Sequence, residues 1–162
     1  MSLADFFSPV DSNKVSSHAE FFASQLGSQA EIFINEFPDL EGEKFDIAII
    51  GVLEDRNAVH NQGCALGPDY VREKFYSLYQ GPYTTRIVDL GNIKAGNTVS
   101  DTYFALKTVV AELVKKDILP LIIGGGQDLT YAQYLAYETL EQKVVLVIVD
   151  PKFDLGEAED AS

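Results

Sequence analysis

The chain has 162 residues, of which 46% are hydrophobic, so it can bury the core of one ordinary domain and is not disordered throughout. Its 25 acidic residues against 12 basic ones give a formal charge of −13, which argues against nucleic acid as a partner. There is no apolar run of the roughly 20 residues that a membrane helix needs, and no signal-peptide pattern, so we expect a cytoplasmic protein. The single cysteine, Cys64, excludes an internal disulfide framework and a multi-cysteine metal site.

The first elements follow a change of pattern at residue 45. Residues 1–44 mix helical spacing with polar breaks, and we predict a helical lead-in. The compact apolar run "FDIAIIGV" at 45–52 predicts a buried strand. Pro68 and Asp69 then predict the first turn of a helix that runs to Gly81. Arg72 in this helix is expected to make a surface ion pair.

The remaining elements alternate between strand and helix. Thr98 or Ser100 is expected to cap the helix predicted at 101–117. We predict strands at 86–93, 118–126 and 143–150, with helices at 101–117 and 128–140. The last strand, "KVVLVIVD", has almost no polar alternation, as expected where helices cover both faces of a parallel sheet. The fold class is therefore α/β, a three-layer α-β-α arrangement with a parallel sheet.

Ligands of such sheets bind beyond the carboxyl ends of the strands, which singles out the loops at 53–63, 124–130 and 150–160. The glycines at 124–126 precede a helix, so one alternative is a nucleotide-binding domain with a phosphate cradle. Against it, Leu129 replaces the third glycine of the dinucleotide motif, and Asp128 lies where an anion would bind. Asp128 is favoured as the N-cap of the following helix. His60, in the first loop, is favoured as a solvated side chain.

The last of these loops contains Asp150, Lys152 and Asp154 at a spacing of two. Alternate side chains of an extended segment share one side, so the three groups can converge. Two neighbouring carboxylates repel each other and attract a cation. A divalent metal is one such cation, and the Lys152 ammonium is another.

Two motifs together carry a resemblance to a known family. The segments "GGGQD" at 124–128 and "DPKFD" at 150–154 resemble the Gly-Gly-Asp-His-Ser and Asp-Ala-His-x-Asp motifs of the arginase/ureohydrolase family. The first is closer still to the Gly-Gly-Gly-His-Glu form of the formimidoylglutamase branch. "NQGCALGPDYVREKF" and "RIVDLGNI" resemble two earlier segments of the family, in the same order. The resemblance implies a partial arginase-like fold, with residues 1–44 as the lead-in and 45–162 as the N-terminal half of the family's α/β domain.

The resemblance also implies a metal site with altered ligands. The family's first His ligand falls on Gln127, its bridging Asp on Asp150, its second His on Lys152 and its next Asp on Asp154. In the family these residues help to hold two Mn²⁺ ions that activate a water molecule. Asp150 and Asp154 are thus the implied metal ligands, whereas Gln127 and Lys152 are degenerate ligand positions. The family's later Ser-x-Asp-x-Asp-x-x-Asp-Pro motif is absent from the sequence.

By resemblance, then, the expected function is hydrolysis of a C–N bond in an amidine or guanidine substrate such as N-formimidoyl-L-glutamate. Because ligands are replaced, we expect the chain to be weakly active or inactive, with Lys152 in the place of a metal. One alternative retains catalysis with a single metal bound by Gln127, Asp150 and Asp154. Another is a non-catalytic regulatory or interaction module. The implied partners are a small-molecule amidine-type substrate and further copies of the chain, with no nucleic acid and no membrane.

Overall fold

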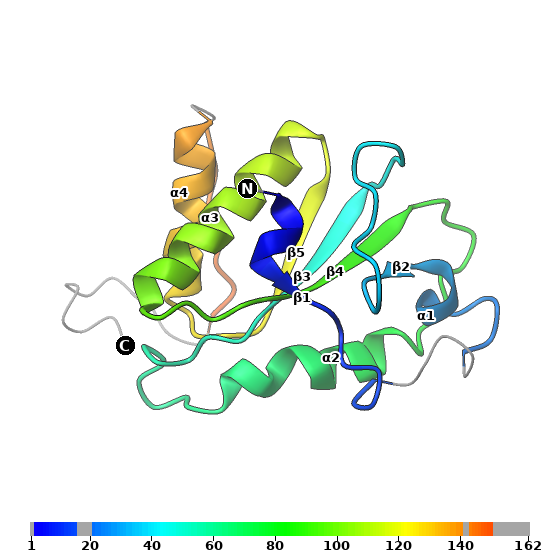
Figure 1. Ribbon diagram of the computed structural model, residues 1–162, viewed down its shortest axis with the longest axis horizontal. Helices are drawn as coiled ribbons and strands as arrows, with labels where there is room; N and C mark the ends of the chain where they lie inside the picture. Colours follow the sequence, from blue (N-terminus) through cyan, green and yellow to red (C-terminus); the bar gives the residue numbers. More distant parts are fainter. Residues whose placement is uncertain (1, 16–20, 141–142, 151–162) are drawn as a thin grey trace.

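The computed structural model describes residues 2–15, 21–140 and 143–150. At its centre lies a five-stranded sheet with helices on both sides (Figure 1). The strands are β1 (Phe7–Ser8), β2 (Glu31–Ile32), β3 (Ile47–Val52), β4 (Ile87–Ile93) and β5 (Leu119–Ile123). The helices are η1 (Leu3–Phe6), α1 (Leu26–Gln29), η3 (Cys64–Leu66), α2 (Gly67–Phe75), α3 (Val99–Lys115) and α4 (Leu129–Thr139), where η marks a 3₁₀ helix.

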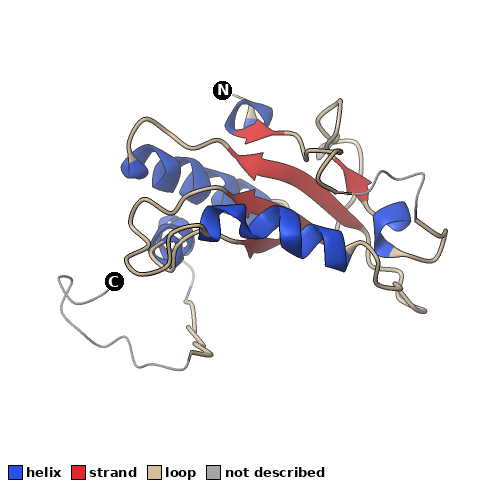
Figure 2. Ribbon diagram, turned by 90° about the horizontal axis from the view of Figure 1, so that it is seen from below, coloured by secondary structure: helices blue, strands red, loops and turns tan. Residues whose placement is uncertain are grey.

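The sheet confirms the predicted α/β class. Its strand order is β1-β4-β3-β5, and β2 also pairs with β4. The pairs β3–β4, β3–β5 and β2–β4 are parallel, whereas β1 runs antiparallel to β4. Helices α3 and α4 pack together on one face, and α2 covers the other (Figures 1 and 2). The three-layer α-β-α arrangement is therefore present.

Burial on both faces explains the apolar character of the central strands. Five of the six residues of β3 are buried, and so are six of the seven of β4. Alternate β3 residues belong to the main core, which α3 completes with Leu106, Val109, Val110 and Leu113. Helix α3 begins at Val99, two residues before the predicted start, because Thr98 is its N-cap: Thr98 accepts the backbone N–H of Asp101, and the Asp101 carboxylate accepts the N–H of Thr98 at 2.7 Å.

The expectation of a surface ion pair for Arg72 is wrong. Its side chain is completely buried between α2 and the sheet. The guanidinium donates two hydrogen bonds to Asp89, each at 2.8 Å, one to the Asn92 amide oxygen at 2.6 Å and one to the Gly91 carbonyl at 2.8 Å. Tyr76 donates to the same Asp89 carboxylate at 2.6 Å. The buried charge of Arg72 is thus fully partnered, as a charge in a protein interior must be.

The lead-in is less helical than predicted. Within the described part of residues 1–44 the helices are short, and the segment adds two strands, β1 and β2, to the sheet through β4. The lead-in also ends α2 early, because the carbonyls of Tyr76 and Leu78 accept the N–H groups of Gly27 and Leu26. Helix α2 therefore stops at Phe75 and not at Gly81.

The predicted strand at 143–150 is wrong for the structure as described. These eight residues are exposed and belong to no strand. Their apolar, β-branched sequence favours extended backbone, yet a strand also needs a neighbour for its N–H and C=O groups. Within the described residues, β5 pairs with β3 alone, and 143–150 does not join its other side.

Replacing Arg72 with Leu should destabilise the protein by about 3–5 kcal/mol, because it leaves the buried Asp89 carboxylate without its cation. Urea denaturation followed by circular dichroism measures this change. The control is Arg86→Leu, which removes an exposed ion pair with Glu43 and should cost less than about 1 kcal/mol. Equal losses for the two variants would contradict the role assigned to Arg72.

Candidate functional site

The carboxyl ends of the parallel strands β3, β4 and β5 lie at one edge of the sheet, as the sequence predicts. The loops after these strands gather there, at the left of Figure 2. They are residues 53–66, 94–98 and 124–128. Any site that follows the general rule for parallel sheets belongs at this edge.

A buried carboxylate, Glu54, joins the first two loops. Its oxygens accept hydrogen bonds from the Arg56 backbone N–H at 3.0 Å, from Arg56 Nε at 2.9 Å and from the Thr102 hydroxyl at 2.9 Å. Arg56 also donates to the carbonyls of Asn97 at 2.9 Å and Gly96 at 3.1 Å. The hydrogen bonds from the Arg56 side chain lower the pKa of Glu54 to about 2. The loop after β3 is thus tied to the loop after β4 and to the start of α3.

The glycine turn serves close backbone packing. Gly124 and Gly125 have φ values of +81° and +83°. A Cβ at Gly124 would lie 2.5 Å from Pro68 Cδ, and one at Gly125 would lie 2.9 Å from the Glu54 carbonyl oxygen. Side chains at these positions would therefore push the turn away from α2 and from the first loop.

The nucleotide-binding alternative is not supported by this turn. The Gly125 N–H donates to the Cys64 carbonyl at 3.4 Å, and the Gly126 N–H donates to the Glu54 carbonyl at 2.9 Å. A phosphate cradle needs such N–H groups to point at the anion. Because two of them are already used within the protein, the turn connects two loops and does not form a cradle.

Asp128 lies at the N-cap position of α4, as predicted, but it does not cap the helix through its side chain. Its Oδ2 accepts a hydrogen bond from the Tyr103 hydroxyl, which accepts one in turn from the Asn57 amide at 3.2 Å. Burial, and next the hydrogen bond to Asp128, raise the pKa of Tyr103 to about 12. This contact has no local signal in the sequence, because Tyr103 is one residue of a helix and its partner Asp128 lies 25 residues further along the chain.

The structure brings together two of the four candidate ligand positions. Gln127 Nε2 donates to Asp150 Oδ2 at 3.3 Å, although 23 residues separate them in sequence. Both side chains are exposed at the carboxyl-end edge of the sheet. Lys152 and Asp154 lie outside the described residues. His60 is exposed in the first loop, as expected, with φ of 63°.

The described residues do not make up a manganese site. They contain no group of three or more His, Cys, Asp or Glu side chains that could hold a metal ion. The Asp150 carboxylate accepts the Gln127 amide N–H, so these two described positions together offer one carboxylate and one neutral amide.

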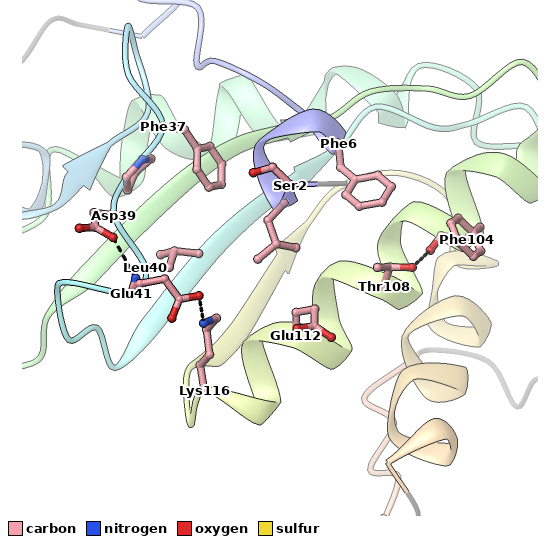
Figure 3. A pocket seen from close by; sticks show the side chains of 12 residues that line it. Ser2, Phe6, Phe37, Asp39, Leu40, Glu41, Phe104, Thr108, Glu112 and Lys116 are labelled. Carbon is pink, nitrogen blue, oxygen red and sulfur yellow. Dashed lines mark hydrogen bonds and ion pairs between the residues drawn. The ribbon is translucent and has the colours of Figure 1, made fainter.

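A cavity of about 630 Å³ lies away from this edge, between the N-terminal segment and α3 (Figure 3). Half of its twelve lining residues are apolar and half are polar or charged, and Lys116 and Glu41 form an ion pair at its rim. The apolar side chains are Leu3, Phe6, Phe37, Pro38, Leu40 and Phe104. The cavity includes neither Gln127 nor Asp150.

Comparison with known proteins places the chain in a family. The model of the arginase family matches residues 45–162, so the chain belongs to the arginase family. Its curated relatives are formimidoylglutamases. That of Macrococcus caseolyticus is 33% identical over 156 residues, which cover 88% of this chain and 46% of the relative. That of Lysinibacillus sphaericus is 32% identical over 124 residues, which cover 70% and 38%.

Solved structures support the fold. The formiminoglutamase of Trypanosoma cruzi, solved with Mn²⁺, matches with a TM-score of 0.54 at 24% identity, over 62% of this chain and 40% of that one. A hypothetical agmatinase from Burkholderia thailandensis matches with a TM-score of 0.55 at 22% identity, over 65% and 36%. The chain thus spans about half, or less, of the length of these relatives. Within its described part, none of the helices is both long and apolar enough to cross a membrane.

Replacing Arg56 with Ala should reduce the loss of stability in acid. The pKa of Glu54 is lowered from 4.5 to about 2 in the fold, so its ionised form stabilises the protein above the unfolded value, and this contribution disappears as the pH falls through about 2. Because the Arg56 side chain is partly exposed, we expect a contribution on the order of 2 kcal/mol. Urea denaturation from neutral pH to acid should show a shallower loss for Arg56→Ala than for wild type. A parallel loss in both proteins would contradict the prediction; Arg86→Ala, at an exposed pair, is the control.

Proposed function

We propose that the chain carries a ureohydrolase site of the formimidoylglutamase type with an altered metal centre, and that it is weakly active or inactive in the hydrolysis of an amidine-type substrate. The contact between Gln127 and Asp150 supports this proposal. It joins the turn after β5 to the segment that follows α4 at the edge where a parallel sheet binds its ligands. By resemblance, both residues occupy metal-ligand positions.

The charge at this site favours a replacement of metal over retention of metal. Asp150 and Asp154 are the two carboxylates in the ligand positions, and Lys152 lies between them in sequence. At about 4 Å and an effective dielectric constant near 20, an ammonium–carboxylate contact is worth roughly 4 kcal/mol before desolvation. The Lys152 ammonium would thus neutralise the carboxylates of Asp150 and Asp154, which otherwise attract a metal cation. The same positive charge would repel Mn²⁺ from these carboxylates.

Titration with Mn²⁺ by calorimetry tests this charge replacement. Wild type should show no binding below millimolar Mn²⁺, and Lys152→His should bind at least tenfold more tightly, because an imidazole replaces a repelling charge. Lys143→His is the matched control, since it makes the same change seven residues before Asp150 and should leave affinity unchanged. Micromolar binding by wild type, or no gain in Lys152→His, would contradict the proposal.

Hydrolysis of N-formimidoyl-L-glutamate tests the activity. Water attacks the formimidoyl carbon, the C–N bond to glutamate breaks, and the products are glutamate and formamide. With Mn²⁺ present, the 162-residue chain should release glutamate far more slowly than a full-length formimidoylglutamase assayed beside it. Activity that belongs to this chain should fall in the Asp150→Asn variant, whereas activity of a contaminating enzyme should not change. Turnover equal to that of the full-length enzyme would contradict the proposal of an altered site.

The second candidate is a non-catalytic interaction module on the same fold. One observation favours it: residues 144–149 present a continuous row of exposed apolar side chains, which is unusual for an isolated surface. Size-exclusion chromatography with a mass detector distinguishes the two candidates, because an interaction module forms a defined complex whether or not Mn²⁺ is present.

A further inference from the structure

A second cavity, of about 570 Å³, lies at the amino ends of the parallel strands, opposite the carboxyl-end edge. Its described lining consists of residues 29–31, Phe45, Gln80 and residues 83–87, which belong to the segments around the starts of β2, β3 and β4. These residues include no part of β5 or of the segment that follows α4. Small-molecule sites usually enclose about 300–1,000 Å³. The cavity is therefore large enough for a small molecule.

The wall of this cavity contains a carboxylate, Glu31, that has no cationic partner. Glu31 is half-buried at the start of β2, and no hydrogen bond or ion pair joins its side chain to another described residue. Arg86, the cation of the described wall, is paired with Glu43 and lies over the Phe45 ring, 5.0 Å from its centroid. Burial, and next the charge of Glu43, raise the pKa of Glu31, and the opposite effect of Arg86 does not outweigh them. A further cation would therefore stabilise this carboxylate.

The two glutamines of the wall use N–H groups within the protein. Gln80 Nε2 donates to the carbonyl oxygens of Tyr83 at 2.9 Å and Thr85 at 3.0 Å. Gln29 Nε2 donates to the Ala23 carbonyl oxygen. Because both N–H groups of Gln80 are engaged, the group that it can offer to a ligand is its oxygen, an acceptor. Together with the carboxylate of the same wall, this amide suits a ligand that brings positive charge and N–H donors.

An organic cation fits this wall better than a metal ion does. The described part of the chain contains no group of three or more His, Cys, Asp or Glu side chains that could hold a metal. A divalent metal takes several such ligands. An ammonium or guanidinium group, in contrast, is bound by one carboxylate with neutral acceptors, and it tolerates an aromatic neighbour such as Tyr83.

We propose that this cavity binds a small organic cation with N–H donors, an alkylammonium or alkylguanidinium, through the Glu31 carboxylate and the Gln80 amide oxygen. The site lies at the opposite edge of the sheet from Gln127 and Asp150, and it needs no metal. It therefore does not rest on the proposed function. The formal charge of −13 adds a general attraction for cations, which variants with matched net charge separate from binding in the cavity.

Titration of the isotope-labelled 162-residue chain in EDTA, followed by amide NMR shifts, tests the binding. The probes n-butylammonium and n-butylguanidinium should each bind with a Kd on the order of 1 mM, as expected for ligands of so few atoms. Tetramethylammonium has the same charge but no N–H donor, so it should bind at least tenfold more weakly, and n-butanoate should not bind. Absence of binding by both butyl cations, or equally tight binding of tetramethylammonium, would overturn the proposal.

Replacing Glu31 with Gln removes the charge and keeps the shape of the side chain, so the Kd of n-butylammonium should rise at least tenfold. Glu138→Gln is the matched control, since Glu138 is exposed on α4 and its replacement changes the net charge equally. This control should leave the Kd unchanged, and both variants should keep the circular dichroism spectrum of wild type. Unchanged affinity in Glu31→Gln, or equal weakening by both variants, would refute the site.

The position of the shift changes provides a test that needs no variant in the cavity. The largest changes should fall on the backbone N–H groups of Glu31 and Thr85 and on the Gln80 side-chain amide. Asp150→Asn should leave the affinity unchanged, because Asp150 lies at the other edge of the sheet. Shifts centred on residues 124–128, with affinity lost in Asp150→Asn, would assign the cation to the site of the proposed function and would overturn the second site.

Discussion

The buried pair of Arg72 and Asp89 is the interaction on which the rest of the structure depends. It fixes α2 against β4 with two parallel hydrogen bonds, and Asn92 and Tyr76 complete the network. Because the guanidinium and the carboxylate are both fully buried, neither can lose its partner without a large penalty. The start of α2 is thereby held near the glycine turn, where Pro68 fills the space that a side chain at Gly124 would need. A buried charge pair between α2 and β4 thus helps to set the position of the glycine turn at the carboxyl-end edge.

The loops themselves are then joined by polar contacts. Glu54, Arg56 and Thr102 connect the first loop to α3, and Tyr103 with Asp128 connects α3 to α4. The loops of the site are therefore joined by several polar contacts, although Asp128 Oδ1 is buried without a hydrogen-bond partner, whereas the described ligand positions offer one carboxylate and one amide. The fold can therefore be preserved while the chemistry of the site changes. Packing determines which residues the scaffold tolerates, whereas metal binding determines only the ligand residues.

Several features of the fold follow from the sequence because they depend on local pattern. The β-branched run at 45–52, the capping box from Thr98 to Asp101 and the Pro68 helix start each act over a few residues, and each is present. The misses all depend on partners distant in sequence. Arg72 looks like a surface residue until Asp89 is placed beside it, and β1 and β2 are too short to show a period. Gln127 and Asp150 were predicted at one edge by the rule for parallel sheets, and they do meet, but the Tyr103 contact with Asp128 has no local signature.

Residues 143–150, which were predicted as a strand and belong to none, show the limit of local pattern most clearly. The apolar, β-branched sequence of this segment favours an extended strand that is buried on both faces of a sheet. A strand also needs neighbouring strands for its N–H and C=O groups, and the propensity of the segment does not supply them. The described structure leaves six apolar residues of this segment exposed, and β5, at the end of the described sheet, is buried at only one of its five residues. The carboxylates at 150 and 154 that the resemblance assigns to a metal are present, so the altered positions Gln127 and Lys152 are what separates this chain from the family's ligand set.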